Sequence, residues 1–348
     1  MNYSFKGGVT YPPLSPLEEA RQRERHAMFI DCAKLGALLL GYEILNKILT
    51  YVYYGIVASV NGGGFYMLPS DSVAFLRAHQ EISRSTVFSM GANLFVVCIS
   101  ATVTLITARL ILKARLSEMI KPHKQHFPQA FKWMPLCMLA NVMISLVINI
   151  LKSYFAAYGV TIPENDFTIV SPTTAAIVMQ FVYVIVVGPI VEELIFRGLI
   201  LTLLKPYGSG VAIFFSAFCF GIMHGNIPQA ASAFGSALIM AAIALKCGSV
   251  IPTILIHIFN NMMASYSDFS AVMNWPYADE IQMAIQIILM FAGVFVLLVF
   301  GKQLLDLKGK PCAMTFGQRM AAAFSNPLLL SFIAYELYFM IKTIINAN

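Results

Sequence analysis

Long apolar runs alternate along the chain with short polar stretches. Eight of these runs are long enough to cross a bilayer, since about 20 apolar residues span its hydrocarbon core. They lie near residues 33–60, 86–111, 133–156, 174–203, 211–227, 230–246, 250–266 and 281–301. A ninth run, 327–345, is interrupted by Glu336 and Lys342, so we expect it to be interfacial or weakly spanning. The pattern predicts an all-α fold: a polytopic membrane bundle of about eight transmembrane helices, with this ninth helix beside them.

Composition excludes a soluble protein. Of the 348 residues, 58% are hydrophobic and only 11% are charged, whereas a soluble domain carries roughly 25% charged residues. A soluble fold of this length could not bury so much apolar surface. The six cysteines are scattered without a CxxC pair, so the sequence predicts neither a disulfide scaffold nor a thiolate metal site.

Positive charge follows the alternation of the spans. Lysine and arginine gather in the N-terminal arm and after the second, fourth, sixth and eighth spans, while the intervening loops hold only Arg77, Arg84 and Lys152. The positive-inside rule therefore predicts a cytoplasmic N-terminus. The net charge of +6 is explained by topology, and we expect no nucleic-acid partner. The predicted divisions are a cytoplasmic arm (1–32), N-terminal spans (33–173), a helical core (174–266) and a C-terminal span with a tail (267–348).

Two adjacent carboxylates in the fourth predicted span differ in their surroundings. Glu193 and Arg197 are four residues apart, so on a helix they share a face and can pair. Glu192 lies about 100° round the helix from Glu193 and lacks that partner. An ionisable residue inside a membrane is by default a functional hypothesis. We therefore interpret Glu193 and Arg197 as a structural pair and Glu192 as the working carboxylate.

Two histidines and an asparagine extend this set. His224 follows Phe220 by four residues in the fifth predicted span, and His257 precedes Asn261 by four in the seventh. A single membrane histidine usually makes only an interhelical hydrogen bond, but these residues cluster with Glu192. A carboxylate and imidazoles can activate water, and asparagine or histidine can donate to an oxyanion. The same glutamate and two histidines are also an alternative zinc site with an open position.

The estimated depths of these residues in the membrane differ too much for one common site. At about 1.5 Å per helical residue, Glu192 lies ~20 Å, His257 ~16 Å and His224 ~26 Å from the cytoplasmic ends of their spans. The spread requires helices that tilt, start late or break, or a different boundary for the span at 211–227.

Three ordered motifs resemble the CPBP family, which comprises CAAX prenyl endopeptidases and bacterial homologues known as Abi proteins. The motifs are Glu192-Glu193-x-x-x-Arg197, Phe220-x-x-x-His224 and His257-x-x-x-Asn261, within residues 174–265. The resemblance implies an intramembrane endopeptidase with its site in an internal cavity. By similarity, Glu192 is the general base, His224 helps it to activate water, and His257 and Asn261 stabilise the oxyanion.

The resemblance leaves the cofactor and the cellular role open. Family members are described both as metalloproteases and as metal-independent glutamate-type proteases. The chain lacks the HExxH motif of an ordinary zincin, so we favour no cofactor, with Zn²⁺ on Glu192, His224 and His257 as the alternative. We expect a peptide or lipidated protein substrate and a location in a bacterial cytoplasmic membrane; the oligomeric state stays open. A non-enzymatic immunity, scaffold or chaperone-like protein is the main alternative, and a proton-coupled transporter is a more distant one.

Overall fold

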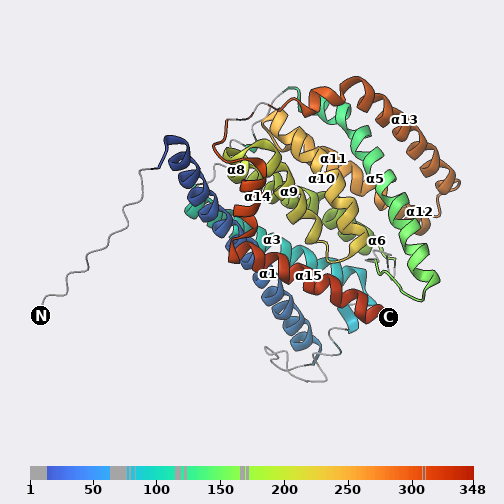
Figure 1. Ribbon diagram of the computed structural model, residues 1–348. Helices are drawn as coiled ribbons and strands as arrows, with labels where there is room; N and C mark the ends of the chain where they lie inside the picture. The colour runs from blue at the N-terminus through green and yellow to red at the C-terminus, as the bar shows by residue number, and fades with distance from the viewer. Residues whose placement is uncertain are drawn as a thin grey trace, which may run out of the picture.

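The computed structural model is a bundle of helices. It describes residues 14–62, 77, 80–82, 84–113, 119–120, 124–164, 169, 172–307, 309 and 311–348, so residues 1–13 of the predicted arm lie outside the described residues. The described part of the chain is helical and contains no strand (Figure 1). The predicted all-α fold is confirmed.

Most of the helices correspond to predicted runs. They are α1 (Pro16–Gly62), α3 (Thr86–Leu112), α5 (His126–Ala157), α9 (Ser209–Ile222), α10 (Ile227–Cys247), α11 (Ile251–Ala264), α12 (Tyr266–Met273), α13 (Ala278–Leu305), α14 (Phe316–Phe324) and α15 (Pro327–Ala347). Between α5 and α9, one continuous stretch contains α6 (Thr174–Gln180), η1 (Phe181–Val187), α7 (Gly188–Glu193), η2 (Leu194–Ile200), α8 (Leu201–Leu204) and η3 (Lys205–Tyr207). Within that stretch η1 and η2 have π-helical turns, and η3 is a 3₁₀ turn.

Six helical stretches among the described residues are long and apolar enough to cross a membrane, which makes this an integral membrane protein. They are Thr86–Leu112, His126–Ala157, Thr174–Tyr207, Ile227–Cys247, Ala278–Leu305 and Pro327–Ala347. The last corresponds to the ninth run, which is therefore long enough to span. The predicted spans 211–227 and 250–266 are too long, since α9 and α11 have 14 residues each. The span at 33–60 lies within α1, which is not among the six.

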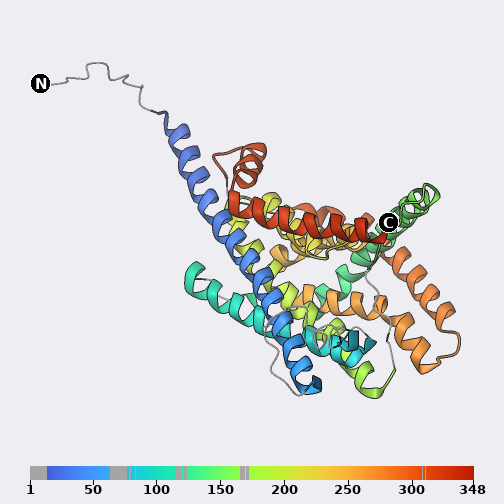
Figure 2. The ribbon, with the colours of Figure 1, turned by 90° about the horizontal axis from the view of Figure 1, so that it is seen from below.

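The site-bearing helices lie at the centre of the bundle. In Figures 1 and 2, α9, α10 and α11 lie between α5 with α13 on one side and α1 with α14 and α15 on the other. One apolar cluster joins α1, α9 and α15 around Phe215, Leu329 and Phe332, and a second joins α5, α10 and α11 around Trp133, Ile243 and Ile256. Burial of these side chains fixes the central helices from both sides.

Loops predicted to share the cytoplasmic side meet at one end of the bundle. Lys132 Nζ donates to the side-chain oxygen of Gln303 at 3.0 Å, and Lys246 Nζ donates to the backbone oxygen of the same residue. Arg319 likewise donates to the carbonyl of Tyr207. This grouping agrees with the predicted alternation of loops, while the cytoplasmic orientation of this end stays a prediction.

Charge in α15 is tolerated because it faces protein. Glu336 is 4% exposed and lies near Glu43 and Lys47 of α1. The Lys47 ammonium also lies 4.7 Å from the ring centroid of Phe339 on α15. Charged groups in membrane helices are expected to face the bundle interior. Glu336 does so, and its charge is therefore compatible with a membrane-spanning α15.

Close packing of α1 on α15 gives a stability prediction. A Cβ atom on Gly36 of α1 would overlap the backbone of Leu328 and Leu329, whereas one on Gly41 of the same helix would meet nothing within 4 Å. Overpacking of this kind typically costs about 1–3 kcal/mol. We expect Gly36→Ala to lower the Tm in detergent by several degrees and the matched control Gly41→Ala to leave it unchanged or higher. Equal Tm values for the two variants would contradict this packing.

Candidate active site

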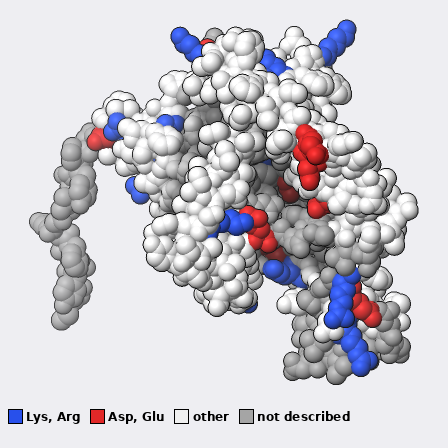
Figure 3. Space-filling view, turned by 90° about the vertical axis from the view of Figure 1, so that its right-hand side faces the viewer, with Lys and Arg blue, Asp and Glu red and all other residues white. Residues whose placement is uncertain are grey.

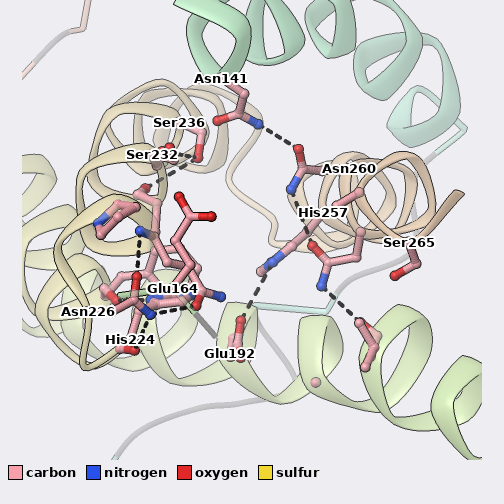
Figure 4. A pocket seen from close by; sticks show the side chains of 18 of the residues that line it. Asn141, Glu164, Glu192, His224, Asn226, Ser232, Ser236, His257, Asn260 and Ser265 are labelled. Atoms are coloured by element: carbon pink, nitrogen blue, oxygen red, sulfur yellow. Dashed lines mark hydrogen bonds and ion pairs between the residues drawn. The ribbon is translucent and has the colours of Figure 1, made fainter. Parts of the chain in front are cut away.

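A polar cavity of about 780 Å³ opens among the central helices. Its lining includes Glu192 on α7, His224 in the turn after α9, and His257 and Asn261 on α11. The structure therefore brings together all four residues that the sequence singled out for catalysis, as the close view in Figure 4 shows for the three that it labels, Glu192, His224 and His257. Figure 3 shows the face seen after a 90° turn, where acidic atoms and some basic atoms lie around a hollow and most other described atoms are uncharged.

An irregular helix carries Glu192 into this cavity. The Gly188 N–H bonds to the carbonyl of Tyr183, five residues back, and Pro189 has no N–H to donate. This wide turn leaves the carbonyl of Val184 outside the regular helical ladder. Asn261 Nδ2 donates to that carbonyl at 2.8 Å and so ties α11 to η1. Single π-helical turns within helices occur frequently at functional sites.

The predicted pair of Glu193 and Arg197 is present and buried. Arg197 Nη1 lies 2.9 Å from Glu193 Oε1, and both side chains are 0% exposed. The guanidinium carbon of Arg197 also lies 4.3 Å from the ring centroid of Phe220. Arginine is suited to such a position because its planar group can pair with a carboxylate and stack on an aromatic face together. The pair lies behind the cavity wall, whereas the Glu192 side chain is 36% exposed.

His257 lies between the two carboxylates, a contact that the sequence did not predict. Its Nδ1 is 3.0 Å from Glu193 Oε1, and its Nε2 is 3.6 Å from Glu192 Oε2. A carboxylate can only accept, so Glu193 places a proton on Nδ1. Glu193 thereby fixes the ring orientation of His257 and turns Nε2 toward Glu192 and the cavity.

His224 reaches the site from a turn rather than from a helix. The prediction that it lies within a span is wrong, because α9 ends at Ile222 and the turn continues to Asn226. His224 Nδ1 donates to the carbonyl of Phe220 at 2.8 Å, which leaves Nε2 as an acceptor in the neutral ring. The Phe220 ring lies edge to face with His224 and His257, at centroid distances of 4.9 and 5.6 Å. Because both histidines contact the same ring, the estimated difference in depth does not separate them.

Neutral carboxamides that the sequence analysis missed also line the cavity. Asn141 Nδ2 on α5 donates to Asn260 Oδ1 at 2.5 Å, and Asn260 Nδ2 lies 3.2 Å from Asn261 Oδ1. These side chains are uncharged, and so a prediction based on ionisable residues within spans did not include them. Asparagines within apolar runs were the signal available. Glu164 is a further lining residue, and its carboxylate pairs with Lys152 at 2.7 Å.

The donor set does not fit the alternative zinc site. Across the described residues, no three histidine, cysteine, aspartate or glutamate side chains lie close enough together to hold a metal ion. A zinc site also needs three protein ligands around one point. We therefore derive no step through a metal.

Burial of the Glu193 and Arg197 pair gives a second stability prediction. Removing one partner of a buried ion pair typically costs about 3–5 kcal/mol, because the other charge is left uncompensated. We expect Arg197→Ala to lower both folded yield and Tm. The control is Lys152→Ala, which breaks a partly exposed ion pair and should change stability by at most about 1 kcal/mol. Unchanged thermal unfolding of Arg197→Ala would rule out the structural role of the pair.

One known protein family matches the part of the chain that holds the predicted site. Residues 174–263 match the family model described as type II CAAX prenyl endopeptidase Rce1-like. No curated protein and no solved structure matches the chain. The matched residues run from the start of α6 to near the end of α11, and they include Glu192, His224, His257 and Asn261. Over about a quarter of its length, the chain is thus similar to the type II CAAX prenyl endopeptidases, as its motifs predicted.

Proposed function

We propose that this protein is an intramembrane endopeptidase that hydrolyses a peptide bond of a membrane-associated or lipidated peptide. The observation that carries the proposal is the division between two adjacent carboxylates. Glu193 is fully buried with Arg197 and His257, while Glu192 faces a cavity that His224, His257 and Asn261 also line. A purely structural motif has no need of the second carboxylate in a polar cavity.

Water activation is the first step of the proposed reaction. Glu192 removes a proton from a water molecule in the cavity as the water oxygen attacks the carbonyl carbon of the peptide bond. His224 helps to orient this water, since its Nδ1 is held by the Phe220 carbonyl and its Nε2 can accept a hydrogen bond. The attack produces a tetrahedral intermediate with a negatively charged oxygen.

Two side chains of α11, His257 and Asn261, stabilise that oxygen. With both ring nitrogens protonated, His257 donates Nδ1–H to Glu193 and presents Nε2–H to the cavity. Asn261 uses one amide hydrogen on the Val184 carbonyl and has a second for the oxyanion. Donors held in place before the reaction stabilise developing charge without reorganising. The C–N bond then breaks, and the proton held by Glu192 passes to the leaving amine.

Substrate and cofactor are part of the same proposal. A peptide bond near the membrane surface, with or without a lipid group, fits a polar cavity among apolar helices. Prenylated CAAX-type peptides, pheromones, bacteriocin leaders and anchored proteins are all candidates. We propose direct water activation by Glu192 without a metal ion.

The test compares peptides released in membranes that carry the wild type or Glu192→Gln, each with and without a chelator. Loss of a general base typically slows such a reaction about 10²–10⁴-fold. We expect Glu192→Gln to abolish detectable cleavage while its Tm stays that of the wild type. The chelator should have no effect on the wild type.

A matched variant separates this role from a general effect of charge in the cavity. Glu164→Gln removes another carboxylate that lines the same cavity, and we expect it to retain cleavage. Cleavage by Glu192→Gln at the wild-type rate would reject Glu192 as the base. Absence of cleavage by the wild type would instead favour a non-enzymatic scaffold. Loss of wild-type cleavage with chelator would instead require a metal.

A further inference from the structure

We propose that Asn141 of α5 is a positioning residue for the oxyanion donor Asn261, acting through Asn260. This inference rests on the proposed function. Asn141 lies outside the residues that match the family model, which begin at Thr174. The three asparagines come from two helices, α5 and α11, and Figure 4 shows the dashed contact between Asn141 and Asn260 at the cavity.

Hydrogen bonds join these side chains end to end. Asn141 Nδ2 donates to Asn260 Oδ1 at 2.5 Å, and Asn260 Nδ2 donates to Asn261 Oδ1 at 3.2 Å. Asn261 Nδ2 donates in turn to the carbonyl of Val184 at 2.8 Å. We refer to these three side chains and the Val184 carbonyl as the amide chain.

The carbonyl at its end sets the direction of the whole amide chain. A backbone carbonyl can only accept a hydrogen bond, so Asn261 must turn its nitrogen toward Val184. Its oxygen then faces Asn260, which must present its own nitrogen, and the oxygen of Asn260 faces Asn141. Each side-chain amide therefore has one orientation that satisfies both neighbours.

This arrangement aims the second amide hydrogen of Asn261 at the substrate. Asn260 holds the Asn261 oxygen, and Val184 takes one of the two amide hydrogens, so the other remains for the oxyanion. Linked hydrogen bonds polarise one another, which strengthens the last donor. Because the oxyanion is absent from the bound substrate and develops only as the reaction proceeds, a defect in this donor lowers kcat more than it changes KM.

Asn141→Leu tests the proposal, because leucine is close to asparagine in size and cannot donate to Asn260. We expect kcat for peptide cleavage to fall about 10- to 100-fold, less than or equal to the loss of one direct oxyanion donor. KM should stay within about threefold, since ground-state binding is unchanged. Asn141→Gln keeps a carboxamide donor and should recover part of kcat.

Asn149→Leu is the matched control. Asn149 lies on the same helix and also lines the cavity, but it is outside the amide chain. We expect its kcat to stay within about threefold of the wild type. Equal losses of kcat in the two leucine variants would overturn the proposal, because they would report cavity polarity rather than the amide chain. An unchanged kcat in Asn141→Leu would overturn it as well.

A second measurement does not depend on activity. In protein with isotope-labelled asparagine, the side-chain amide signals of Asn261 should shift in Asn141→Leu and stay in place in Asn149→Leu. If no peptide is cleaved by the wild type, the proposed function fails, and these signals still decide whether Asn141 positions Asn261. Unshifted Asn261 signals in Asn141→Leu would reject the amide chain even if the wild type is a protease.

Discussion

The buried carboxylate of Glu193 is the constraint on which the site depends. An uncompensated charge in an apolar interior costs several kcal/mol, and this side chain is 0% exposed. Arg197 supplies the opposite charge from the same helix, and His257 supplies a hydrogen bond from α11. Because Glu193 binds both, it holds α11 against α7 and sets the orientation of the His257 ring. Glu192, the next residue along the helix, is left to face the cavity.

The backbone carbonyl of Val184 is a second polar group in the apolar interior that needs a partner from α11. The π-helical turn before Gly188 releases the carbonyl of Val184, and Asn261 satisfies it. Backbone groups in a membrane must find partners within the protein. The irregular helix and α11 are therefore joined twice, once through Glu193 and once through Val184. Through Asn260 and Asn141 the second connection extends to α5, which the family resemblance does not cover.

Much of the fold could be predicted from the sequence, and so could the gathering of Glu192, His224, His257 and Asn261 around one cavity. The apolar runs predicted the helices, and the spacing of Glu193 and Arg197 predicted their pair, because both follow from local periodicity. The contact of His257 with Glu193 could not be predicted, since it joins residues 64 positions apart. Nor could the end of α9 before His224, because the apolar pattern continues into the turn. Asn141 was not predicted because its side chain is uncharged, whereas the site prediction was based on ionisable residues within spans.

The division of labour between two adjacent carboxylates is the central claim of this account. Measuring peptide cleavage and thermal unfolding side by side for Glu192→Gln and Glu193→Gln tests it most directly. The account predicts that Glu192→Gln loses cleavage at an unchanged Tm, whereas Glu193→Gln has a lowered Tm because Arg197 loses its counter-charge. Two variants with the same Tm and the same cleavage rate would contradict it.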